Sequence, residues 1–117
     1  MNKSPDEIIN EIFSFISYED MVISGNDDLI SLSRVLKIQY GTFSIIEYIR
    51  KQMRERKIFY VPLSIYDKIK DKLPLDHESF IYLTSEFIEK YIWNCYYISW
   101  NLSLTLELIE KYKDKLN

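Results

Sequence analysis

Residues 83–91 read LTSEFIEKY and residues 104–112 read LTLELIEKY, so one short motif recurs 21 residues further along the chain. A fainter copy opens at Leu63-Ser64, and its KDKL at 70–73 matches KDKL at 113–116. A unit of 20 to 24 residues is too short to enclose its own core, but stacked units can bury isoleucine and aromatic faces against one another. The sequence therefore predicts an all-α protein in which residues 63–117 form degenerate, stacked helical-hairpin repeats.

Residues 1–42 predict a small head of three helices ahead of the repeats. Ser4 is a good N-cap and Pro5 suits the first helical position of the opening helix. Its apolar residues recur at helical spacing, at Ile8, Ile9, Ile12, Phe13 and Ile16. A turn at residues 24–28 precedes a further helix, which Asp27 or Asp28 caps. The apolar residues of that helix are Leu29, Leu32, Val35 and Leu36.

Residues 43–62 predict a connecting helix with a basic end, which begins near Thr42. Its cations are Arg50, Lys51, Arg54, Arg56 and Lys57. Cations favour the negative end of a helix, so a solvated last turn is one interpretation. The other is a contact with a target or with the phosphates of a nucleic acid. Residues 58–61, before Pro62, fit a short extended piece or a buried connector.

Composition restricts the class of protein. The chain has 117 residues, 47% of them apolar, which is enough for one domain with a real core. The net charge of −3 gives no general attraction to nucleic acid. No apolar run is long enough to span a bilayer. Cys95 is the single cysteine, which excludes an internal disulfide and a cysteine-based zinc site and favours the reducing cytoplasm.

Residues that could carry catalysis are few. His77 is the only histidine, and we expect it on the surface, with no second histidine to share a metal. Cys95 lies in an apolar stretch, where we expect it to be buried. Tyr96, Tyr97 and Trp100 could stack on bases or anchor an interface, but a place in the core of the repeats is favoured. We therefore expect no enzyme activity, no cofactor and no metal.

Two stretches of the head resemble the halves of an F-box. Residues 4–20, SPDEIINEIFSFISYED, are similar to the family's Leu-Pro pair, acidic residue, two aliphatics, Ile-Phe-Ser-x-Leu and Asp-Leu. Residues 28–40, DLISLSRVLKIQY, are similar to its Asp-Leu-x-x-Leu-x-x-Val-Cys-Lys-x-Trp stretch. Residues 21–28 form an eight-residue insertion, and Gln39 stands where the family commonly has tryptophan.

The resemblance implies a partner for the head. F-boxes dock onto a Skp-type adaptor of a cullin ubiquitin ligase, and attached repeats recruit a target. Matched residue by residue, the positions that would face the adaptor are Pro5, Ile8, Ile9, Ile12, Phe13, Ile16, Leu29, Leu32 and Val35.

The repeats are similar to short tandem repeats in proteins of large, AT-rich DNA viruses, which implies a viral protein acting in the host cytoplasm. Asn117 matches Asn94, so the sequence ends within a unit.

Three functional hypotheses follow. The first is a non-enzymatic protein–protein interaction module, an F-box-like adaptor or decoy. The second is a structural or self-associating protein, such as a virion component, whose apolar faces form a homo-oligomer. The third, which the net charge disfavours, is a nucleic-acid contact through residues 50–57.

Overall fold

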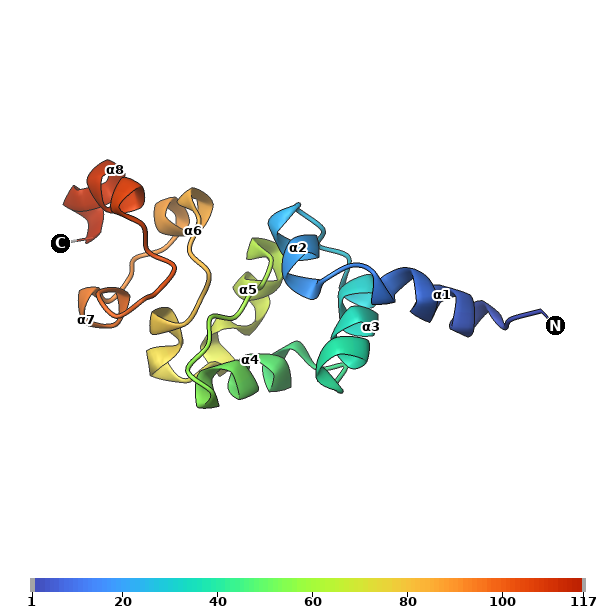
Figure 1. Cartoon of the computed structure of the whole chain (residues 1–117). Helices are drawn as coiled ribbons and strands as arrows, with labels where there is room; N and C mark the ends of the chain where they lie inside the picture. The colour runs from blue at the N-terminus through green and yellow to red at the C-terminus, as the bar shows by residue number, and fades with distance from the viewer. Residues whose placement is uncertain (1, 117) are drawn as a thin grey trace.

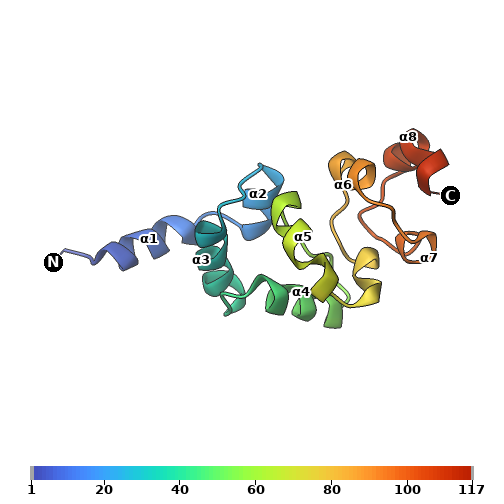
Figure 2. The same ribbon diagram turned by 180° about the vertical axis from the view of Figure 1, so that it is seen from behind.

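The protein is all-α and elongated. The computed structural model describes residues 2–116, except for the side chains of Ile9 and Phe13. It measures 60 × 24 × 23 Å, and the two termini lie at opposite ends (Figure 1; Figure 2). The α-helices are α1 (Pro5–Ser14), α2 (Tyr18–Ile23), α3 (Leu29–Tyr40), α4 (Ile45–Arg54), α5 (Leu63–Ile69), α6 (Ser85–Lys90), α7 (Cys95–Ile98) and α8 (Leu106–Leu116). Two 3₁₀ helices, η1 (Lys70–Lys72) and η2 (Leu75–Ser79), follow α5.

Short polar side chains set where the helices of the head begin. Ser17 accepts a hydrogen bond from the Asp20 N–H at 2.9 Å at the start of α2. Asp28, one of the two expected caps, accepts from the Ser31 N–H at 3.4 Å at the start of α3. The connecting helix begins at Ile45, later than expected, because Ser44 caps it. Each cap satisfies a backbone donor that the first turn leaves unpaired.

A single hydrophobic core runs from α2 to α7. Tyr18 and Tyr48 are both fully buried in it, with ring centroids 4.8 Å apart. The Tyr18 hydroxyl donates to the Tyr60 carbonyl at 2.7 Å, and the Tyr48 hydroxyl accepts from the Tyr60 N–H at 3.1 Å. Other core residues are Met21, Leu32, Val35, Leu36, Ile45, Ile49, Phe59, Val61, Ile65, Tyr66, Leu73, Ile81, Leu83, Phe87, Ile88, Trp93 and Ile98.

The segments that lead into successive repeat helices are hydrogen-bonded to one another. The Phe59 N–H donates to the Phe80 carbonyl at 2.8 Å, and the Tyr82 N–H donates to the Phe59 carbonyl at 2.9 Å. Phe59 and Ile81 thereby form an isolated parallel bridge, and there is no β-strand within residues 2–116. Farther along, the Asn101 amide donates to the Ile81 carbonyl at 2.8 Å. Residues 58–61 are thus both extended and mostly buried.

Helices α5, α6 and α8 occupy equivalent places in three successive repeat units, which we call the first, second and third unit. Each helix breaks at the same position, where φ is −114° at Ile69, −117° at Tyr91 and −119° at Tyr112. Figure 1 shows the three helices following one another along the molecule from α2 toward the C-terminus.

The burial of several single residues differs from what the sequence predicted. His77 is buried, because its ring nitrogens bond the Tyr66 hydroxyl and the Pro74 carbonyl, each at 2.7 Å. Cys95 is exposed, because α7 is one turn long and its only buried residue is Ile98. Tyr96 and Trp100 are also exposed rather than part of the core. None of the helices within residues 2–116 is long and apolar enough to cross a bilayer.

Buried tyrosines should make the fold sensitive to alkali. Burial raises the pKa of Tyr18, Tyr48 and Tyr66 above the usual value near 10. A group whose pKa is higher in the folded state stabilises that state below its unfolded pKa, and this contribution is lost as the pH rises. We expect the free energy of unfolding, measured with urea, to fall steadily above about pH 10. A constant free energy across that range, with tyrosinate already absorbing, would contradict the burial of these hydroxyls.

The exposure of Cys95 can be measured directly. Because its thiol is at the surface, we expect a maleimide to label the folded protein within about threefold of the rate for the urea-unfolded chain. A Cys95→Ser variant is the control for labelling at other groups. Labelling that occurs only after unfolding would show that the thiol is buried.

Candidate protein-binding surface

Helix α1 lies outside the core and projects from one end of the molecule (Figure 1; Figure 2). Ser4 caps it as expected, accepting from the Glu7 N–H at 3.2 Å, and Pro5 is its first residue. Asp6 lies 3.8 Å from the guanidinium of Arg34 on α3, which is an exposed ion pair of small energetic value. Helix α1 therefore contacts the body mainly through α3.

One side of α1 is apolar and faces solvent. Ile8 and Ile12 lie on this side, Ile16 follows two residues after the helix, and between 38% and 56% of each is exposed. Phe15, just after the helix, is 87% exposed. We call Ile8, Ile12, Phe15 and Ile16 the α1 stripe. A run of large apolar side chains along one exposed helix is the surface that a groove on a partner can cover.

Gln39 bonds the backbone on the C-terminal side of α1, between α1 and α2. Its amide nitrogen donates to the Ile16 carbonyl at 2.6 Å, and its amide oxygen accepts from the Tyr18 N–H at 2.9 Å. The side chain therefore joins α3 to the short link that follows α1 and to the first residue of α2. Since Tyr18 is fixed in the core, Gln39 determines where α1 leaves the body.

The residues expected to face an adaptor do not form one surface. Ile8, Ile12 and Ile16 lie on the α1 stripe, and Pro5 is exposed at its start. Leu29 is exposed, but it lines a cleft of about 480 Å³ between α3, α4 and α5. The side chains of Ile9 and Phe13 lie outside the described residues.

Leu32 and Val35 require a correction. Both are fully buried, because this side of α3 packs into the core of the protein itself. Neither side chain can contact a partner in this structure.

The basic residues expected to contact a target or nucleic acid surround the end of α4. Lys51 and Arg54 lie in its last turn, where their positive charges interact favourably with the negative end of the helix dipole. Arg50 is 3.1 Å from Glu47, and Lys57 is 3.6 Å from Glu55. Arg56 is exposed. Neighbouring acids thus reduce the local positive charge.

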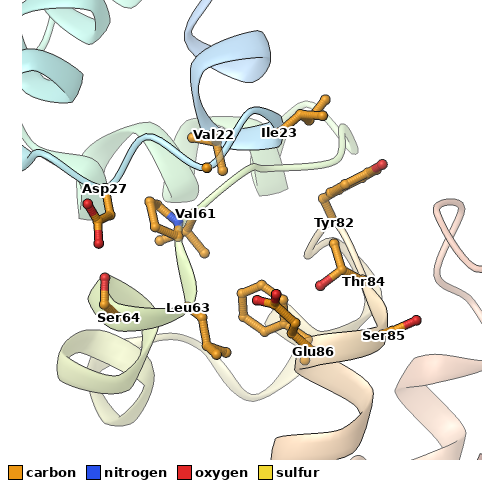
Figure 3. Close-up of a pocket in the computed structure, with 13 residues that line it drawn as sticks. Val22, Ile23, Asp27, Val61, Leu63, Ser64, Tyr82, Thr84, Ser85 and Glu86 are labelled. Carbon is orange, nitrogen blue, oxygen red and sulfur yellow. The ribbon is translucent and has the colours of Figure 1, made fainter.

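A second cleft, of about 630 Å³, opens between the end of α2 and the starts of α5 and α6. Figure 3 shows Val22 and Ile23 on one side of it and Leu63, Tyr82 and Glu86 on the other. Its lining is mixed, with serine and threonine hydroxyls and two carboxylates but no histidine, cysteine, lysine or arginine. No group of three potential metal ligands occurs within the described part of the chain.

Three features were missed by sequence reasoning. Phe15 was overlooked although it stands three residues after Ile12 and seven after Ile8, a spacing that is typical of one helix face. Gln39 was noted only for departing from a tryptophan, although a polar residue near a helix end can bond free backbone groups. The cleft of Figure 3 combines segments more than 60 residues apart in sequence, from Val22 to Phe87, and had no local signal.

Comparisons with family models, curated proteins and solved structures find no match to this chain.

The role of Gln39 predicts a local effect on α1. Replacing it by leucine removes two hydrogen bonds, so we expect a loss of about 1–3 kcal/mol in unfolding free energy. Hydrogen exchange of the Tyr18 amide should also become faster. Lys37→Gln, at a neighbouring exposed position of α3, is the control and should change stability by less than about 0.5 kcal/mol. Equal effects of the two variants would show that Gln39 does not hold this link.

Proposed function

We propose that this chain is a non-enzymatic protein–protein interaction module that docks the α1 stripe onto a Skp-type adaptor of a cullin ubiquitin ligase, as an adaptor or a decoy. The observation that carries the proposal is the exposed apolar side of α1, at the end of the molecule. The resemblance of residues 4–20 and 28–40 to an F-box supports the choice of partner.

The energetics favour an apolar partner surface. Fully burying an isoleucine or phenylalanine side chain contributes about 1.5–3 kcal/mol, and the residues of the α1 stripe are between 38% and 87% exposed before docking. The α1 stripe could then supply several kcal/mol on docking. Asp6 and Glu11 form ion pairs with Arg34 and Lys3, so charge on this helix contributes little to docking and the apolar contact dominates.

The α1 stripe is exposed in the folded protein, whereas the core-facing side of α3 could contact a partner only after unfolding. A partner can reach Ile8, Ile12 and Phe15 while Leu32 and Val35 keep the head folded. The proposed contact is therefore narrower than the family pattern and rests on α1.

Self-association is the second candidate, because a second copy could cover the same stripe. The two functions differ in their dependence on concentration, so one set of variants can separate them.

The test is a binding titration of the full chain against a purified eukaryotic Skp-type adaptor. The double variant Ile8→Asp/Ile12→Asp places two charges in the proposed contact. We expect it to weaken binding at least about 30-fold, since loss of roughly 2 kcal/mol corresponds to that factor. The control is Ile92→Asp, because Ile92 is almost fully exposed in the connection after α6, far from α1.

The outcomes are distinct. Binding that the α1 variant loses and the Ile92 variant keeps supports the proposal. Binding that survives both variants would reject the stripe as the contact. No adaptor binding, together with a mass in light scattering that rises with concentration and returns to the monomer value in the α1 variant, would establish self-association instead.

A further inference from the structure

The cleft of Figure 3 combines an apolar floor with two carboxylates. Val61, Pro62 and Phe87 line it and are buried. Asp27 borders it from the loop between α2 and α3, and Glu86 borders it from the first turn of α6. Both acids are exposed, and no lysine or arginine lines the cleft. The cleft therefore suits a positively charged group on an apolar stem, such as a lysine or arginine side chain.

Several polar side chains of this cleft have no partner within residues 2–116. The ion pairs there are formed by other acids, so neither Asp27 nor Glu86 is paired with a cation. Thr84, the N-cap of α6, makes no capping hydrogen bond with its side chain. Figure 3 shows the Asp27 carboxylate and the Ser64 hydroxyl pointing toward one another. A ligand can bond these groups without displacing an ion pair of the protein.

The cleft continues along α5. The cleft of about 480 Å³ between α3, α4 and α5 is also lined by Asp27 and Ser64, so these residues lie where the two clefts meet. Beyond them the lining is mainly apolar and includes the exposed Leu29 and the half-buried Ile46. Lys68 lines it too and disfavours a second cation there. We call the two clefts together the α5 groove.

The dimensions of the α5 groove suit an extended peptide. Ser64 and Lys68 are four residues apart on α5, which is about 6 Å along the helix axis. In an extended chain, side chains two residues apart point to the same side and are separated by about 6.6 Å. One side chain can therefore lie beside Asp27 and Glu86 while the next but one lies against Leu29.

We propose that the α5 groove binds an extended segment of a partner protein in which a lysine or arginine lies two positions from a large apolar residue. The cation lies beside Asp27 and Glu86, and the apolar side chain enters the cleft between α3, α4 and α5. Hydrogen bonds between a cation and a carboxylate are stronger than neutral ones, and the hydroxyls of Ser64 and Thr84 can bond peptide groups. The groove is separate from the α1 stripe, so this binding does not rest on the proposed adaptor contact.

The probe is the peptide acetyl-Ser-Arg-Ser-Ile-Ser-amide, titrated into the full chain and followed by the amide NMR signals. We expect saturable shifts within residues 23–29, 63–69 and 84–87, with a dissociation constant of roughly 1 mM or tighter. Citrulline in place of arginine keeps the shape of the side chain but removes its charge, and it should weaken binding about tenfold. Serine in place of isoleucine should weaken binding about fivefold, because an apolar contact is lost.

The acids are tested with the double variant Asp27→Asn/Glu86→Gln, whose exposed positions leave the core unchanged. We expect it to bind the arginine peptide about tenfold more weakly and to bind the citrulline peptide equally well. The matched control is Glu107→Gln/Asp114→Asn, which changes the net charge by the same amount at exposed positions of α8. Its affinity should stay within about twofold of that of the original chain.

The proposal is rejected if the arginine peptide does not saturate, if the citrulline peptide binds equally well to the original chain, or if the two double variants act alike. Butane-1,4-diamine tests whether an amine alone is recognised. Binding of this diamine at least as tight as that of the peptide would assign the groove to a small amine and overturn the proposal. Sedimentation tests a second copy as the occupant: a dimer that Asp27→Asn/Glu86→Gln dissociates would also overturn it.

Discussion

The backbone of Tyr60 links the two halves of the protein. Its carbonyl accepts a hydrogen bond from the hydroxyl of Tyr18 on α2, and its N–H donates one to the hydroxyl of Tyr48 on α4. An unpaired backbone group at the edge of a core would cost roughly 1–3 kcal/mol. The neighbouring Phe59 is bonded on its other side to Phe80 and Tyr82. One short extended segment therefore connects the helical head to the first repeat, and both halves depend on its position.

The two ends of the molecule expose apolar residues for different reasons. Helix α1 touches the body mainly through α3, so its far side has no neighbour in the chain. Helix α8 packs on the preceding repeat with one side only, and Leu106 and Ile109 on it are exposed. An interaction at the first end is recognised by its apolar character alone.

The sequence predicted the all-α fold, the cap at Ser4 and a cap at Asp27 or Asp28, of which Asp28 is the one observed, because these depend on residues a few positions apart. Helical spacing also showed which residues share a side of α3. It could not show that this side, with Leu32 and Val35, faces the core, since that depends on α2 and α4. The expected burial was wrong for His77 and for Cys95 for a similar reason. His77 is buried because it bonds Tyr66, and Cys95 is exposed because α7 has only one turn.

The contacts between successive repeats have a consequence for how the protein opens. A chain of units that contact mainly their neighbours has a stability close to a sum of unit and junction terms. Units with a junction on both sides are held more firmly than a unit with one. Because α1 lies outside the core and α8 has no buried residue, local unfolding should begin at these two helices, while the core around Tyr60 opens last. The protein should therefore unfold in a defined order, from its ends toward the core around Tyr60, which its helix content alone does not indicate.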